Sequence, residues 1–348
     1  MTTKPKVSVI VTTFNCEKYV SRCLFALLDQ TMKDIEIICV DDASTDNTAV
    51  LVESILTCFK NSKFIRLSKN SGPSHARNEA LKYVTADYVM FCDGDDFYDK
   101  DMCRSMYERL SSENVDLVVS QIRVEYDIAI SRKVEKSDHK YYKLKFSGTS
   151  YVTDHLILKT DLSVCNKIFK KSVLDTYNIR FPNGLFYKDA YFCMAYFFVS
   201  KLAYFINKSM YTYVRHAGSV MTNTFFGNSR AKDHLVIAFK IYEFMIKNNV
   251  FERCKQVYPV ILSNCYQFAV KFSDRSSLDS INKSCLDFIN KNKLQDKFPH
   301  PALRCIVEGG ALNPNYTFAE LIFSIKNSID LRYRIITVLG AKIKLRRR

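Results

Sequence analysis

Residues 88–96 read Tyr-Val-Met-Phe-Cys-Asp-Gly-Asp-Asp, a short apolar run that ends in three acids. An apolar run of this length beside polar turn residues is typical of a buried strand. Ligands of open α/β sheets bind beyond the carboxyl ends of the strands, so Asp93, Asp95 and Asp96 are expected to face a crevice. Such closely spaced carboxylates repel each other unless they are neutralised. The stretch indicates either a site for Mg²⁺ or Mn²⁺ or a solvated acidic turn in which Asp96 caps the next helix.

The chain before this stretch alternates between strand-like and helix-like segments. Strands are predicted at 7–12, 35–40 and 64–67, and helices at 19–30, 44–59 and 73–84. Strands that alternate with helices at this spacing form βαβ units. The sequence therefore predicts an α/β fold with a mostly parallel, Rossmann-like sheet flanked by helices.

Polar residues follow each predicted strand. Thr12, Asp42, the segment 70–78 and the acids at 93–96 are therefore expected to converge at one edge of the sheet, as a nucleotide site would require. Neither a glycine-rich dinucleotide motif nor a Walker loop is present in the sequence. Phosphate binding would then depend on a metal and basic side chains, which disfavours dehydrogenases and P-loop enzymes.

The remainder of the chain suggests three further regions. Predicted elements are a helix at 100–110, strands at 116–126, 164–169 and 203–214, a variable excursion at 131–150, and helices at 186–199, 234–246, 254–272 and 281–290. We expect one domain over 1–225, with a nucleotide-binding half (1–110) and an acceptor half (111–225). A helical region (226–325) and a basic amphipathic tail (326–348) follow.

Composition restricts the class of protein further. The chain has 348 residues, 47% of them hydrophobic, and a formal charge of +15, which indicates an acidic partner. Its twelve cysteines are scattered without metal-knuckle spacing, so free thiols in reducing cytosol are expected. No signal peptide is recognised, and the apolar segment 190–199 is too short for a bilayer span and predicts a buried helix.

The predicted tail concentrates positive charge. From Lys326 to Arg348 it has eight basic residues against the single acid Asp330, interleaved with aliphatic side chains. This pattern suits an anionic membrane surface, at about 1 kcal/mol per basic residue. A solvated tail is the alternative. No nucleic acid partner is expected, because no RNA-binding motif accompanies the charge.

Four segments taken in order resemble the inverting glycosyltransferases of family 2, which have the GT-A fold. They are Val7–Asn15, the pair Asp41 and Asp42, the segment Asn70–Asn78, and Asp93-Gly94-Asp95-Asp96 as the DxD element. The resemblance covers about Pro5 to Met221. The basic segment near the carboxyl terminus is similar to that of bacterial transferases that build surface glycans.

The resemblance implies roles for donor-site residues. Thr12, Phe14 and Asp42 would hold the uracil of a UDP-sugar, with Arg77 nearby. Asp93 would contact the ribose and sugar region. The same resemblance implies that Asp95 binds Mn²⁺ or Mg²⁺ bridging the diphosphate.

Two further positions are implied on the acceptor side. Asp189 falls where the family has its catalytic base, and His216 falls where some relatives place a further metal or diphosphate contact. The family usually has Glu before that Asp, whereas this chain has Lys188. Asp189 is otherwise an acid favoured at a helix N-terminus, and His216 is otherwise a surface or hydrogen-bonding residue.

The expected function is that of a metal-dependent inverting glycosyltransferase. It would move a hexose from a UDP-sugar to a hydroxyl of a lipid-linked or surface-glycan acceptor such as lipopolysaccharide, capsule or exopolysaccharide. Its expected location is the inner face of the cytoplasmic membrane, as a peripheral protein. A nucleotidyltransferase and a catalytically degenerate nucleotide-sugar-binding module remain alternatives, the latter supported mainly by Lys188.

Overall fold

The computed structural model of the chain describes residues 4–127, 146–216, 230–294, 333–338 and 341–346, the last two ranges as backbone. Most of the predicted excursion at 131–150, and much of the helical region before residue 326, lie outside the described residues. The chain divides into two compact units. Unit 1 comprises Met1–Asn223 with Phe244–Val250, and unit 2 comprises Thr224–Glu243 with Phe251–Arg348.

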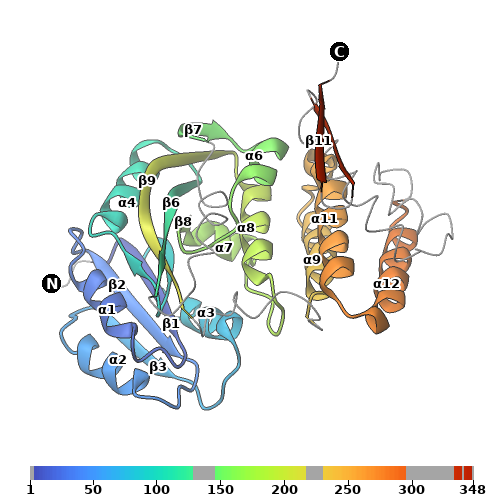
Figure 1. The fold of residues 1–348 in the computed structure, drawn as a ribbon. Coiled ribbons are helices and arrows are strands. Elements are labelled where there is room, and N and C mark those ends of the chain that lie inside the picture. Colours follow the sequence, from blue (N-terminus) through green and yellow to red (C-terminus); the bar gives the residue numbers. More distant parts are fainter. Residues whose placement is uncertain (1–3, 128–145, 217–229, 295–332, 339–340, 347–348) are drawn as a thin grey trace. The chain divides into compact units, whose positions relative to one another are not determined.

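The amino-terminal part of unit 1 has the predicted parallel strands (Figure 1). They are β1 (Val7–Thr13), β2 (Ile35–Asp41), β3 (Ser62–Arg66) and β4 (Tyr88–Asp93), in the order β3-β2-β1-β4. Continuous burial along β1 explains its run of Val and Ile, since a strand covered on both faces needs apolar side chains throughout. The register pairs Thr12 with Asp93 and Thr13 with Asp41, which aligns the polar ends of three strands.

The helices predicted between these strands are also present, as α1 (Val20–Leu28), α2 (Thr48–Leu56), α3 (Pro73–Leu81) and α4 (Met102–Ser112). Asp46 accepts a hydrogen bond from the backbone N–H of Thr48 at 3.0 Å, which satisfies a donor at the start of α2. Pro73 occupies the first turn of α3, where its missing N–H costs nothing. Local chemistry therefore supports the starts of α2 and α3.

The second part of unit 1 extends the same sheet in mixed orientation. β8 (Lys167–Lys170) lies antiparallel between β4 and β6 (Leu117–Tyr126), and β6 is parallel to β9 (Leu202–Arg215). β5 (Phe97–Tyr98) and β7 (Gly148–Tyr151) pair antiparallel with β9. Strands before and after residue 110 belong to one continuous sheet. The division of this domain into two halves at that residue therefore stays a prediction.

The segments beside β8 were predicted only in part. The short helices α6 (Asp154–Lys159) and α7 (Lys171–Thr176) were not expected, whereas α8 (Lys188–Val199) confirms the predicted buried helix. Phe192 of α8 stacks on Phe181 with ring centroids 4.2 Å apart and meets Phe91 of β4 edge to face at 5.5 Å. Burying each such ring contributes about 2 to 3 kcal/mol. This aromatic cluster fixes α8 against the centre of the sheet.

Unit 2 contains the predicted helices, except that the last turn of the first one, from Phe244, belongs to unit 1. They are α9 (Asp233–Lys247), α10 (Phe251–Cys254), α11 (Val257–Phe272) and α12 (Leu278–Lys291), with the 3-10 turn η3 (Arg275–Ser277) before the last. Within the predicted tail, β10 (Tyr333–Val338) and β11 (Ala341–Arg346) pair antiparallel, an arrangement that the sequence did not predict.

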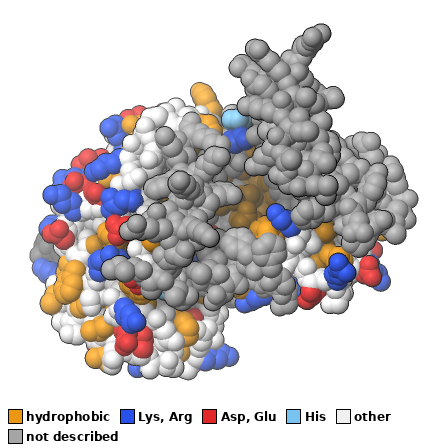
Figure 2. All heavy atoms as spheres, in the orientation of Figure 1, with side chains coloured by type: hydrophobic (Ala, Val, Ile, Leu, Met, Phe, Trp, Pro, Cys, Tyr) orange, Lys and Arg blue, Asp and Glu red, His pale blue; other side chains and the backbone are white. Residues whose placement is uncertain are grey.

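The described residues show how the charged side chains, the cysteines and the apolar helices are distributed. Basic and acidic side chains are interspersed over the part of unit 1 visible in Figure 2, rather than gathered by sign. The cysteines in the described ranges are all free thiols, as expected. None of the described helices combines the length and apolar character that a membrane crossing needs.

Candidate active site

Four of the predicted site residues meet beyond the carboxyl ends of β1 and β4. The hydroxyl of Thr12 donates to Oδ1 of Asp93 at 3.2 Å. Nη2 of Arg77 donates to the same oxygen at 2.7 Å, and Nη1 donates to Oδ1 of Asp189 at 2.6 Å. Residues from β1, α3, β4 and α8 therefore form one polar cluster. The convergence of Thr12, Arg77 and Asp93 was predicted from the strand ends, and Asp189 joins them from α8, at the position that the resemblance implied.

Asp93 is the acid at the centre of this cluster. Burial alone would raise its pKa, but the charge and hydrogen bond of Arg77, followed by the charge of Lys188, outweigh burial and lower it. The Sγ of Cys165 contacts the other carboxylate oxygen at 3.8 Å. Asp93 is consequently ionised, and Thr12, Arg77 and Cys165 contact its carboxylate.

Asp42 lies at the end of β2 and clamps the loop before α3. Its two carboxylate oxygens accept the backbone N–H groups of Ser71 at 2.8 Å and Gly72 at 2.7 Å. Each oxygen keeps a second lone pair, so an N–H of a bound base could still be accepted there. Phe14 is 46% exposed just beyond β1, where its ring is available to a ligand.

The position between the two acids of the DxD element is occupied by Gly94, and a side chain there would lie too close to β1. The N–H of Gly94 donates to the carbonyl of Thr12 at 2.9 Å. A Cβ at this position would lie 2.7 Å from Cγ2 of Thr13 and 3.0 Å from Sγ of Cys16. The turn that presents Asp93 and Asp95 therefore depends on close approach to β1.

Asp96 does not cap the following helix, so that alternative was wrong. Its carboxylate accepts the hydroxyl of Tyr211 and, at 2.7 Å, the backbone N–H of Val214, both on β9. The N-cap of α4 is Asp101. Burial raises the pKa of Asp96, and the charges of Asp95 and Asp93 add to that rise. This acid anchors the DxD turn to β9 and faces the interior.

Asp95 and His216, the two predicted metal residues, are in direct contact. Oδ2 of Asp95 lies 2.9 Å from Nε2 of His216, and the imidazole stacks on Tyr19 with centroids 4.6 Å apart. The hydroxyl of Tyr19 donates to Asp127 at 2.6 Å. Neither Tyr19, which follows the segment Val7–Asn15 closely, nor Asp127, which is distant from every motif, was predicted to lie here, because the stacking depends on tertiary packing.

The donor set at Asp95 and His216 suits a divalent ion that completes its shell with phosphate oxygens. No group of three or more metal-binding side chains occurs within the described ranges. One carboxylate and one imidazole are nevertheless enough where a diphosphate and waters supply the other ligands, as Mg²⁺ and Mn²⁺ sites commonly allow. The residues therefore fit the predicted metal.

The start of α8 presents Asp189 beside an unusual backbone. Tyr187 occupies the N-cap in the left-handed region with φ of 62°, an uncommon conformation for a residue with a side chain. The side chain of Asp189 remains 31% exposed although Arg77 holds one oxygen. An acceptor hydroxyl can thus still reach this carboxylate.

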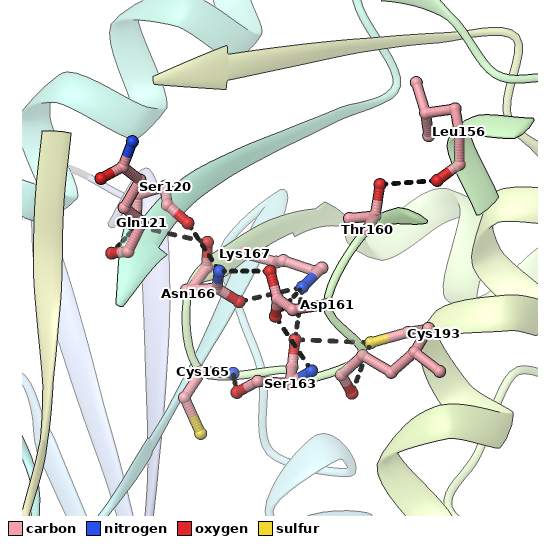
Figure 3. A network of polar contacts seen from close by, with 11 residues as sticks. Ser120, Gln121, Leu156, Thr160, Asp161, Ser163, Cys165, Asn166, Lys167 and Cys193 are labelled. Carbon is pink, nitrogen blue, oxygen red and sulfur yellow. Dashed lines mark hydrogen bonds and ion pairs between the residues drawn. The ribbon is translucent and has the colours of Figure 1, made fainter. Parts of the chain in front are cut away.

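A buried polar network holds the loop of residues 161–167, which brings Cys165 against Asp93 (Figure 3). Nζ of Lys167 donates to Oδ1 of Asp161 at 3.0 Å, to the carbonyl of Ser163 at 2.6 Å and to Oδ1 of Asn166 at 2.9 Å. The amide of Asn166 also donates to the carbonyl of Ser120 on β6 at 2.6 Å. The network ties this loop to the sheet at the place where Cys165 meets Asp93.

Comparisons with known proteins identify similar chains. Residues 8–177 match the family model described as glycosyl transferase family 2. The cholesterol galactosyltransferase of Borreliella burgdorferi is 28% identical over 280 residues, covering 76% of this chain and 74% of that protein. The poly(ribitol-phosphate) beta-N-acetylglucosaminyltransferase TarP of Staphylococcus aureus is 36% identical over 180 residues, 51% of this chain and 52% of that protein.

A solved structure shares the fold over nearly the whole chain. Residues 1–349 of S. aureus TarS, crystallised with UDP-GlcNAc, match with a TM-score of 0.71 at 21% identity, covering 98% of this chain and 97% of that one. The predicted GT-A fold is therefore confirmed. The match over residues 8–177 identifies this part of the chain as a family 2 glycosyltransferase domain, and the shared fold agrees with it.

Proposed function

We propose that the protein is a metal-dependent, inverting glycosyltransferase that moves a hexose from a UDP-sugar to an acceptor hydroxyl. The observation that carries the proposal is the cluster in which Arg77 joins Asp93 to Asp189. In this proposal Asp93 is the donor-side acid and the partly exposed Asp189 is the base, and the shared contact with Arg77 supports their belonging to one site. Crystallisation of TarS with UDP-GlcNAc supports the choice of a UDP-sugar as donor.

The proposed chemistry assigns one task to each part of the site. Asp189 takes the proton of the acceptor hydroxyl as its oxygen attacks the anomeric carbon, a contribution of about 10²- to 10⁴-fold. The bond to the diphosphate breaks on the opposite face, so UDP leaves and the configuration inverts. Asp95 and His216 would hold a divalent cation, which neutralises charge on the leaving diphosphate when bound. Thr12, Phe14, Asp42 and Asp93 would orient the nucleoside.

The acceptor is proposed to be lipid-linked or part of a surface glycan. One relative is named as acting on cholesterol and another on poly(ribitol phosphate). Both names describe acceptors that carry hydroxyl groups. We propose the same class here, and we propose that the basic tail docks the enzyme on the inner face of an anionic membrane.

Calorimetric titration tests the donor assignment. UDP, GDP and CMP are titrated into the protein with Mn²⁺ and with EDTA, and the titrations are repeated on Asp95→Ala and on the control Asp101→Ala. We expect UDP binding that requires both the metal and Asp95 and is unchanged in the control. Absence of metal-dependent binding for every nucleotide would contradict the proposal.

Product analysis separates the alternatives. A glycosyltransferase releases UDP from the donor when acceptor is added. Release of pyrophosphate would instead identify a nucleotidyltransferase. Binding of a UDP-sugar without any turnover would identify a degenerate module.

The tail is tested separately with vesicles. Removal of residues 342–348 is expected to weaken binding to phosphatidylserine vesicles while activity on a soluble acceptor analogue is kept. Equal vesicle binding by the full-length and shortened proteins would show that the tail is not the anchor.

A further inference from the structure

Arg77 is enclosed within the protein and already committed to two acids. Its side chain is only 3% exposed, and its two terminal nitrogens donate to Asp93 and Asp189. The resemblance placed Arg77 near the uracil of the donor. A guanidinium with both terminal nitrogens engaged and almost no exposed surface is instead suited to joining parts of the protein.

The neighbours of Arg77 hold it independently of any ligand. The side chain of Asn78 donates to the carbonyl of Phe181 at 2.7 Å and accepts its N–H at 2.9 Å. The guanidinium lies 5.1 Å from the ring of Phe181, at a separation typical of cation–π contacts. Phe181 in turn stacks on Phe192 of α8. The same ring thus touches Arg77 and packs on the helix that begins with Asp189.

Electrostatics explains why one cation serves two acids. Asp93 and Asp189 come from β4 and α8, and each would be disfavoured as an anion beside the other without compensation. Arg77 is suited to this task because its planar fork can donate to two carboxylates at once, whereas a lysine ammonium is a single point charge. Oδ1 of Asp189 is engaged, and its Oδ2 makes no hydrogen bond to any residue in the described ranges. The arrangement leaves one oxygen of the proposed base accessible.

We propose that Arg77 is a positioning residue that fixes the base Asp189 relative to the donor-side acid Asp93. Because the guanidinium of Arg77 donates to both acids, it sets the position of the proton acceptor Asp189 relative to the donor-binding carboxylate of Asp93. This inference rests on the proposed function, in which Asp189 is the base. It replaces the role in uracil binding that the resemblance implied for Arg77.

A kinetic cycle tests the proposal. The variants are Arg77→Met, Arg77→Lys, Asp189→Asn and the double variant Arg77→Met with Asp189→Asn, and Arg109→Met at the exposed pair with Glu113 is the matched control. We expect Arg77→Met to lower kcat about 100-fold or more with UDP affinity changed less than about threefold, and Arg77→Lys to recover part of the loss. The double variant should be no slower than Asp189→Asn alone. Multiplicative losses, or a weakened UDP affinity with unchanged kcat, would overturn the proposal.

A crystal structure of Arg77→Met provides a readout that does not depend on activity. Without the guanidinium, the carboxylate of Asp189 is expected to leave its position beside Asp93 while the Asn78 clamp on Phe181 remains. A carboxylate that stays in place would overturn the positioning role. A wild-type protein that transfers no sugar would refute the proposed function alone, because the displacement of Asp189 is measured separately.

Discussion

Replacing Lys167 by Met is expected to destabilise unit 1 strongly although the residue touches no substrate. The ammonium is fully buried and donates three hydrogen bonds, to Asp161, Ser163 and Asn166. Met keeps the length of the side chain and removes the charge and all three donors. Asp161, which is 6% exposed, would be left as a buried anion without its cation.

The magnitude follows from this loss of partner. Breaking one side of a buried ion pair typically costs about 3 to 5 kcal/mol, because the remaining charge is not solvated. An exposed pair costs less than about 1 kcal/mol, so Lys171→Met, which breaks the 2.5 Å pair with Asp175 on the surface of α7, is the matched control. Adding Asp161→Asn to Lys167→Met removes both charges and is expected to recover at least about half of the loss.

Urea unfolding followed by far-UV circular dichroism measures the effect, because the chain contains no tryptophan for fluorescence. At a urea slope of about 3 kcal/mol per molar, 4 kcal/mol moves the midpoint down by about 1.3 M. A midpoint shift for Lys167→Met no larger than that of the Lys171→Met control would refute the reasoning. A double variant less stable than the single one would refute the charge explanation specifically.

Four other perturbations have defined outcomes. Asp189→Asn is expected to keep UDP affinity and to lower transfer about 10²- to 10⁴-fold in a UDP-release assay. His216→Ala, like EDTA, is expected to weaken UDP binding at least about tenfold by calorimetry, and unchanged affinity would exclude this residue from the metal site. Gly94→Ala is expected to cost about 1 to 3 kcal/mol in urea unfolding, because its Cβ would lie 2.7 Å from Cγ2 of Thr13. Burial lowers the pKa of His234 from 6.5 to about 4. Between those pH values the unfolded chain binds a proton at His234 that the folded chain does not. The free energy of unfolding is therefore full above pH 6.5 and falls by about 3 kcal/mol towards pH 4. The variant His234→Gln is expected to flatten this pH dependence in urea unfolding measured across the same range.

The parts of the fold that the sequence predicted are those with local signals. The runs of Val and Ile in β1 and β2, and the proline at the start of α3, each identify an element within a few residues. β8 has only four residues, and its antiparallel place between β4 and β6 depends on long-range pairing. The pairing of β10 with β11 likewise depends on contacts between strands, which a basic and aliphatic pattern does not specify.

The candidate site shows the same limit. Thr12, Arg77 and Asp93 were predicted to converge because they follow strand ends, whereas Asp189 was expected only from the family resemblance; all four lie in one cluster. The two proposed metal residues, Asp95 and His216, are also in contact. The partner of each side chain was not predictable. Arg77 belonged to a motif whose sequence gives no sign that both of its terminal nitrogens are used within the protein.

The packing around Gly94 has a consequence for directed evolution of donor preference. The middle position of the DxD element invites randomisation because it lies between two acids of the proposed donor site. Every other amino acid at this position would bring a Cβ against Thr13 and Cys16, so a library there would mainly sample destabilised protein. Diversity is better placed at Phe14, whose exposed side chain leaves room for change without repacking the sheet.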